Sequence, residues 1–86
     1  MPGSSLHPGK PFPLGATPEY GGVNFSIWAR DAARVELLLF DRVEDGVPSR
    51  VIELKRGLHR TYHYWHVLVE GVRPGQLYGW RAHGPF

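Results

Sequence analysis

The sequence predicts an all-β domain built as a two-layer antiparallel sandwich. Apolar and polar residues alternate over several short segments, which is the period of a β-strand. Between these segments lie most of the 11 glycines and 8 prolines of the 86-residue chain, and both residue types favour turns. Over windows of about ten residues, no segment shows the three-and-four apolar spacing of an amphipathic helix. A chain of this length forms one domain.

The N-terminal segment is rich in proline, with four in residues 1–13. Proline has no amide donor and is rare in central strands. We therefore predict that residues 1–13 form an extended lead-in that lies across other structure, and that residues 14–86 form the sandwich. A short edge strand is expected over residues 14–17, and residues 18–22 are expected to form a turn that ends in two glycines.

Residues 23–29 alternate between apolar and other side chains. One face would carry Val23, Phe25, Ile27 and Ala29, and the other Asn24, Ser26 and Trp28. A period of two is typical of a β-strand, in which successive side chains point to opposite sides. The pattern predicts a strand with one buried face and places Trp28 opposite the core.

Residues 34–41 contain the strongest strand signal of the chain. Val35, Leu37 and Leu39 would share one face, while Leu38 and Phe40 would lie on the other face beside Glu36. Apolar residues on both faces are typical of strands that are covered on both sides. Because a domain of this size has little material for a second cover, we predict that Leu38 and Phe40 dock against a further surface.

The rest of the chain is predicted to form further short strands joined by turns. Asp45-Gly46 is a turn dipeptide that precedes a strand predicted over residues 50–54. Strands are also expected over residues 64–69 and 77–82, joined by Pro74-Gly75, which suits a type II turn. About five to seven short strands at this spacing predict an immunoglobulin-like sandwich of two antiparallel sheets.

Composition and charge argue against several classes of partner. The net charge is +2, and the ten basic residues are scattered, so neither a nucleic acid nor a membrane is an expected partner. No apolar run reaches the roughly 18 residues of a membrane-spanning helix, and residues 1–10 lack the apolar segment of a signal peptide. The chain has no cysteine, which excludes disulfides and thiolate metal sites. A cytoplasmic location without a cofactor is expected.

No catalytic residue is predicted within this chain. Glycoside hydrolysis needs two carboxylates held apart across a sugar, but nearly all the acidic residues fall in predicted turns or on polar strand faces. No serine lies in a G-x-S-x-G motif. His59, His63 and His66 are close in sequence, but residues 58–63 have no clear period and are compatible with a loop. On a strand, positions 63 and 66 would point to opposite faces, so a metal site is not expected.

Aromatic side chains are the candidates for sugar binding, because their rings stack on the apolar faces of pyranoses. The candidates here are Trp28, Tyr20 and Tyr64, and Trp28 comes first because it lies opposite the predicted core face. The competing interpretation is that Trp28 packs against a covalently attached neighbour. Trp65 and Trp80 are expected in the core instead.

Three stretches together resemble a known family. They are residues 9–17 followed by 22–29 (GKPFPLGAT and GVNFSIWA), residues 33–41 (ARVELLLFD), and Trp65-His66 with residues 71–86 (GVRPGQLYGWRAHGPF). In this order they resemble the N-terminal domain of isoamylase-type glycogen debranching enzymes. That domain is a member of carbohydrate-binding module family 48, which has an early-set immunoglobulin-like fold.

The resemblance implies a non-catalytic module of a glycoside hydrolase. In the family, the module precedes a (β/α)₈ barrel of glycoside hydrolase family 13 that hydrolyses the α-1,6 branches of glucans. Such a barrel needs roughly 250 residues, so this chain would be a piece of an enzyme without being one itself. His83, Pro85 and Phe86 resemble the point where the family's chain leaves for the barrel, and they join Leu38 and Phe40 as predicted docking residues. The implied partners are the barrel of the same polypeptide and α-glucan.

The sequence departs from the family members that bind glycogen well. Those members carry a tryptophan in the loop after the second core strand and a lysine in the last strand. The corresponding loop here, residues 41–47, has no aromatic residue, and Gly79 stands near the place of the lysine. These departures favour a docking role. An autonomous glycogen- or starch-binding module is the alternative, and a protein-interaction sandwich unrelated to sugars is a third hypothesis.

Overall fold

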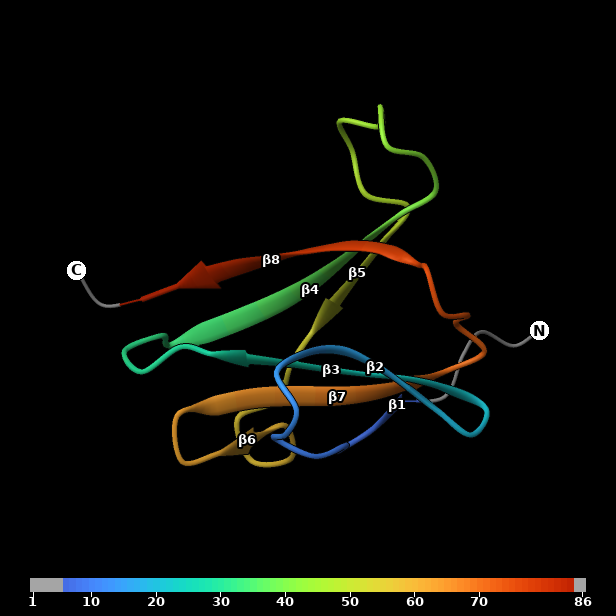
Figure 1. Ribbon diagram of the computed structural model, residues 1–86. Helices are drawn as coiled ribbons and strands as arrows, with labels where there is room; N and C mark the ends of the chain where they lie inside the picture. The colour runs from blue at the N-terminus through green and yellow to red at the C-terminus, as the bar shows by residue number, and fades with distance from the viewer. Residues whose placement is uncertain (1–5, 85–86) are drawn as a thin grey trace.

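The chain folds into two antiparallel sheets that pack face to face (Figure 1). The computed structural model describes residues 6–84. Its strands are β1 (Leu6–His7), β2 (Gly15–Glu19), β3 (Gly22–Trp28), β4 (Arg34–Phe40), β5 (Arg50–Glu53), β6 (Arg60–Thr61), β7 (Tyr64–Glu70) and β8 (Leu77–His83). One sheet has the order β1-β7-β3-β2 with β6 also paired to β7, and the other has the order β5-β4-β8. This confirms the predicted all-β, immunoglobulin-like sandwich.

The strand boundaries differ from the predicted ones mainly near the edges. Two strands of only two residues, β1 and β6, bring the total to eight within residues 6–84. β6 lies within residues 58–63, whose sequence is compatible with a loop. The turn is shorter than the predicted residues 18–22, because Pro18 pairs with Val23 and Glu19 pairs with Gly22. Proline is tolerated there because β2 is an edge strand. In the described part of the chain, no helix is long and apolar enough to cross a membrane.

The core lies between the two sheets and follows the predicted alternation. It comprises Val23, Phe25, Ala32, Val35, Leu37, Leu39, Ile52, Leu54, Trp65, Val67 and Val69. Registered pairs such as Phe25 with Val67 and Leu37 with Trp80 place the members on the inner faces. Trp65 is buried and its indole N–H donates to the carbonyl of Ala29 at 3.2 Å, while Trp80 packs partly buried against the core.

The prediction of one buried face for β3 is wrong, since its outer face is also covered. Asn24 is 1% exposed and Ser26 is 2% exposed. The cover is the proline-rich segment of residues 6–14, which we call the strap. The strap pairs with β7 at its start, crosses β7 and β3 (blue in Figure 1), and continues as β2 beyond β3. Residues 6–13 of the predicted lead-in therefore lie across β7 and β3.

Backbone groups of the strap bind the outward-facing polar side chains of β3. The amide of Lys10 donates to Oδ1 of Asn24 at 2.9 Å, and the Asn24 amide group donates to the carbonyl of Lys10 at 3.0 Å. The hydroxyl of Ser26 donates to the carbonyl of Pro11 at 2.6 Å. Because buried polar groups must be paired, these residues hold the strap and the strap satisfies them.

His66 and Gly9 complete this attachment. The carbonyl of Pro8 can only accept, so Nδ1 of His66 donates to it at 2.6 Å, and Nε2 faces the hydroxyl of Thr61 at 2.8 Å. Gly9 has a φ of +72°, and a Cβ there would meet Oδ1 of Asn24 and lie 2.9 Å from the amide nitrogen of Leu68. Only glycine lets the strap approach β7 this closely.

Candidate functional site

Two surfaces of the sandwich carry most of the predicted site residues. The first is the outer face of the three-stranded sheet, which we call the β4–β8 face. Strand register sets Leu38 between Val51 and Gly79, and sets Phe40 beside Leu77. These apolar side chains are half-buried or exposed rather than covered. The predicted apolar outer face of this strand is therefore present.

One end of the β4–β8 face carries charge. Oε1 of Glu36 lies 2.8 Å from Nε of Arg81 and 2.8 Å from Nε2 of His83. Hydrogen bonds from Arg81 first, and then from His83, lower the pKa of Glu36 to about 2. The same contact raises the pKa of Arg81. His83 thus lies on the same face as Leu38 and Phe40, but at the opposite end of the ladder from Phe40. Pro85 and Phe86 lie outside the described residues.

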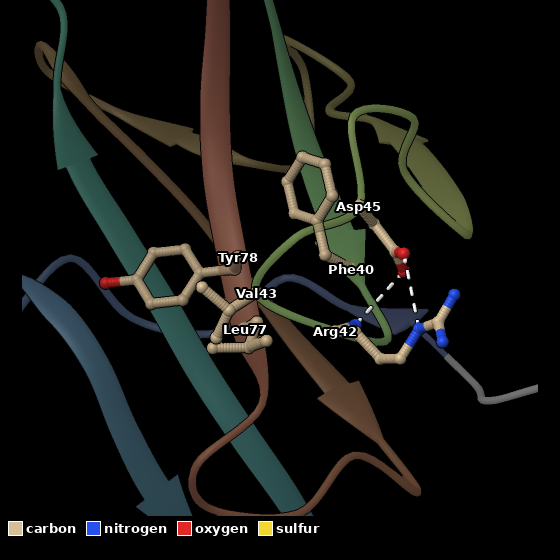
Figure 2. A pocket seen from close by; sticks show the side chains of 6 residues that line it. All are labelled: Phe40, Arg42, Val43, Asp45, Leu77 and Tyr78. Carbon is tan, nitrogen blue, oxygen red and sulfur yellow. Dashed lines mark hydrogen bonds and ion pairs between the residues drawn. The ribbon is translucent and has the colours of Figure 1, made fainter.

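A small hollow lies at the other end of this face, where β4 leads into its loop (Figure 2). It has a volume of about 260 Å³ and is lined by Phe40, Arg42, Val43, Asp45, Leu77 and Tyr78. The loop closes on itself, because the backbone amide of Arg42 donates to Oδ2 of Asp45 at 3.1 Å and its guanidinium lies 3.4 Å from Oδ1. The hollow is below the roughly 300 Å³ at which small-molecule sites begin, so an oligosaccharide would not fit inside it.

The second surface is an aromatic cluster on the outer side of the other sheet. Its members are Phe12, Trp28, Tyr62 and Tyr64. Trp28 is registered with Tyr64 across β3 and β7, with ring centroids 5.0 Å apart. Phe12 of the strap lies 4.6 Å from Tyr64, and Tyr62 lies 5.9 Å from Trp28. Phe12, Trp28 and Tyr62 are exposed, so the rings of this cluster are accessible to a ligand from solvent.

The rings of the cluster are tilted against one another. The interplanar angle is 71° between Trp28 and Tyr64 and 62° between Trp28 and Tyr62. Such edge-to-face contacts stabilise the rings mutually. Because neither angle is near zero, these pairs do not form a flat platform, so a sugar would stack on one ring at a time.

Tyr20 does not belong to the aromatic cluster. It is fully exposed in the turn between β2 and β3, whereas Trp28 ends β3. At about 3.3 Å per residue, the seven-residue strand separates the two side chains by roughly 20 Å. Sequence reasoning missed Phe12 and Tyr62 instead. Phe12 reaches the cluster only through the path of the strap, and Tyr62 lies in a tight turn with a φ of 58°, features that no periodic pattern reveals.

The side chains of the three histidines in this region have different hydrogen-bond partners. Nδ1 of His59 accepts the amide hydrogen of Lys55 at 2.8 Å, and burial chiefly, with His66 and Lys55 nearby, lowers the pKa of His59. His63 lies 3.3 Å from the guanidinium of Arg60, and His66 donates a hydrogen bond to the carbonyl of Pro8 in the strap. Over residues 6–84, no three histidine, aspartate or glutamate side chains gather in a way that could hold a metal ion.

Comparison with known proteins identifies the family. Residues 13–86 match the family described as carbohydrate-binding module 48, the isoamylase N-terminal domain. The chain belongs to this family. Among its relatives, a glycogen operon protein GlgX homolog of Mycobacterium tuberculosis is 45% identical over 95% of this chain, and this region is 10% of that protein. A glycogen debranching enzyme of Erwinia tasmaniensis is 44% identical over 94% of this chain and 11% of its own length.

The solved structures add a similar fold within another large protein. A pullulanase from Paenibacillus barengoltzii, crystallised with maltohexaose and alpha-cyclodextrin, matches 91% of this family 48 module and 12% of its own chain. The TM-score is 0.71 at 24% sequence identity, which shows a shared fold and no more. The module described here thus spans about a tenth of the length of the proteins that it matches.

Proposed function

We propose that this chain is the non-catalytic N-terminal module of a glycogen debranching enzyme and packs on the catalytic barrel of the same polypeptide. The α-1,6-glucan hydrolysis would belong to that barrel. The observation that carries the proposal is the β4–β8 face, where Leu38, Phe40 and Leu77 form a half-buried apolar surface. Two facts support the enzyme class. One relative is named a glycogen debranching enzyme and another a glycogen operon protein GlgX homolog, and this chain spans about a tenth of each.

The outer faces of the two sheets differ in how far they are covered. An antiparallel sheet that faces water on one side is normally polar there. The outer face of β3 and β7 has the strap as its cover, but in the described residues nothing comparable covers Leu38 and Phe40. The neighbouring Glu36 is already paired with Arg81 and His83, so covering this end would not leave its carboxylate without a partner. Both halves of the face therefore suit contact with another protein surface.

Leu38→Asp in the full-length protein tests this docking. A charge at the centre of an apolar contact should weaken the association of module and barrel by about 2 kcal/mol, or roughly 30-fold. Differential scanning calorimetry should then resolve a separate, lower melting transition for the module. Limited proteolysis should release it sooner.

Leu58→Asp is the matched control, because Leu58 is an exposed leucine in the loop after β5. It should leave the calorimetric profile unchanged. The 86-residue chain that carries Leu38→Asp should still show the circular dichroism of a folded sandwich. A full-length Leu38→Asp protein that melts like the unmodified protein would remove the support for this docking face.

The aromatic cluster favours a second candidate function, direct binding of α-glucan. Phe12, Trp28 and Tyr62 expose ring surface of the kind that stacks on sugars. The cluster and the β4–β8 face lie on the outer sides of different sheets, so docking would leave the cluster accessible. Glucan binding and docking are therefore compatible in one module.

Titration with maltoheptaose tests this second candidate. Binding at the cluster should quench tryptophan fluorescence and be abolished in Trp28→Ala, while Tyr20→Ala, outside the cluster, should bind like the unmodified chain. Calorimetry with branched glucan provides the independent measurement. If the chain gives neither quenching nor heat at millimolar sugar, it is a docking module alone.

A further inference from the structure

The hairpin between β6 and β7 contains the one non-glycine residue among residues 6–84 with a left-handed backbone. This residue is Tyr62, whose φ is 58°. Thr61 pairs with Tyr64, so Tyr62 and His63 form a two-residue loop, and of these two only Tyr62 has a positive φ. This is the pattern of a type II′ turn, whose first central position is normally glycine. A tyrosine therefore occupies a position whose backbone conformation favours glycine.

Arg60 holds the loop in this unfavourable conformation. Its Nε donates to the carbonyl of Tyr62 at 2.7 Å, and its guanidinium lies 3.3 Å from Nδ1 of His63. The guanidinium carbon also lies 5.4 Å from the ring centroid of the buried Trp65, within the range of a cation–π contact. The amide of Ala29 donates to the carbonyl of His63 at 2.9 Å. These contacts attach both loop residues to the sheet.

Burial does not explain a tyrosine at this position. Tyr62 is 71% exposed, so removal of its side chain from water contributes little to folding. Its ring contacts are with His63, at 3.9 Å between centroids, and with Trp28, at 5.9 Å, and both neighbours lie at the surface rather than in the core. Strained residues persist where their surroundings hold them, and they gather at functional sites. The strain therefore points to a use of the exposed ring.

Tyr62 and Trp28 together present two exposed rings at an angle of 62°. Successive glucosyl units of an α-glucan are also inclined to one another, because the axial glycosidic linkage bends the chain. Two rings set at an angle can therefore each stack on a different unit of one chain. A flat pair of rings would suit a straight chain instead.

We propose that Tyr62 is a glucan-contacting residue of the aromatic cluster and that Arg60 is its positioning residue. Arg60 holds the ring beside Trp28 against the preference of the backbone. The inference rests on the second candidate function, in which the cluster binds α-glucan. Glycine would suit the backbone at position 62 better, whereas tyrosine provides a second stacking surface.

Tyr62→Gly and Tyr62→Ala in the 86-residue chain test the contact role, because both remove the ring and only the alanine variant keeps the strain. Tyr62→Gly should have a higher urea midpoint than Tyr62→Ala, and at least that of the unmodified chain. Both variants should bind maltoheptaose about tenfold more weakly in isothermal titration calorimetry. Tyr20→Ala is the matched control, since Tyr20 is an exposed tyrosine of another turn, and its binding should be unchanged.

Arg60→Ala tests the positioning role through its dependence on Tyr62. With Tyr62 present, it should weaken maltoheptaose binding about fivefold, because the loop no longer fixes the ring. In the Tyr62→Gly background, it should leave the dissociation constant unchanged. Equal losses in both backgrounds would show that Arg60 supports only the fold, and would overturn its positioning role.

Two results would overturn the contact role of Tyr62. One is a Tyr62→Gly chain that binds maltoheptaose as tightly as the unmodified chain. The other is a Tyr62→Gly chain that is less stable than Tyr62→Ala, since the tyrosine would then not be strained. Trp28→Ala separates this inference from the candidate function. Binding that depends on Trp28 but not on Tyr62 keeps glucan binding and rejects the inference, whereas an unmodified chain that binds no maltoheptaose rejects both.

Discussion

Replacing Phe25 by alanine is expected to cost about 3–5 kcal/mol of unfolding free energy, as is typical for a fully buried phenylalanine. Phe25 is 0% exposed and joins the two layers, since its ring lies 4.9 Å from that of Tyr78 at an angle of 65°. A domain of 86 residues has a total stability of roughly 4–13 kcal/mol. The substitution therefore removes a large share of it, and urea denaturation followed by circular dichroism would measure the loss.

Phe12→Ala is the matched comparison for Phe25→Ala. Phe12 is 57% exposed and contacts Tyr64 at the surface, so its loss should cost less than about 1 kcal/mol. The two variants delete the same atoms from the same residue type at different depths. Similar urea midpoints for both would mean that the sandwich core does not lie where the register places it.

Gly9→Ala should have the second largest effect, because it acts on the strap as a whole. The left-handed φ of +72° strains any residue with a Cβ, and that atom would collide with Asn24 and the backbone of Leu68. The strap must then lift and loosen the paired bonds between Lys10 and Asn24. Strain and lost bonds together should cost about 2–4 kcal/mol in urea denaturation. The Lys10 amide should also exchange faster with solvent.

Gly57→Ala provides the control for Gly9→Ala. Gly57 lies in a loop, and nothing is within 4 Å of the position that its Cβ would take. Its unfolding free energy should change by less than about 1 kcal/mol. If Gly9→Ala were as stable as Gly57→Ala, the close approach of strap and β7 would not contribute to folding.

Several features of the sandwich could be predicted from residues alone. The alternation around Phe25, Leu37 and Val67 indicates which side chains face the core, because a strand has a strict period of two and one face must leave water. Apolar residues on the other face of β4 likewise indicated the apolar outer face at Leu38 and Phe40, which the structure leaves half-buried. These inferences depend only on the alternation of residues along one strand, so they do not require knowledge of the strand order.

Other features depended on which strands meet, and only the tertiary structure decided them. The burial of Asn24 and Ser26 comes from a strap that is distant in sequence and has no periodic pattern. Strand register placed His83 on the same face as Leu38, and it joined Trp28 to Tyr64 while leaving Tyr20 apart. The physical reason is that periodicity defines the two sides of a strand, whereas contacts between segments follow from sheet order and register, which no single strand encodes.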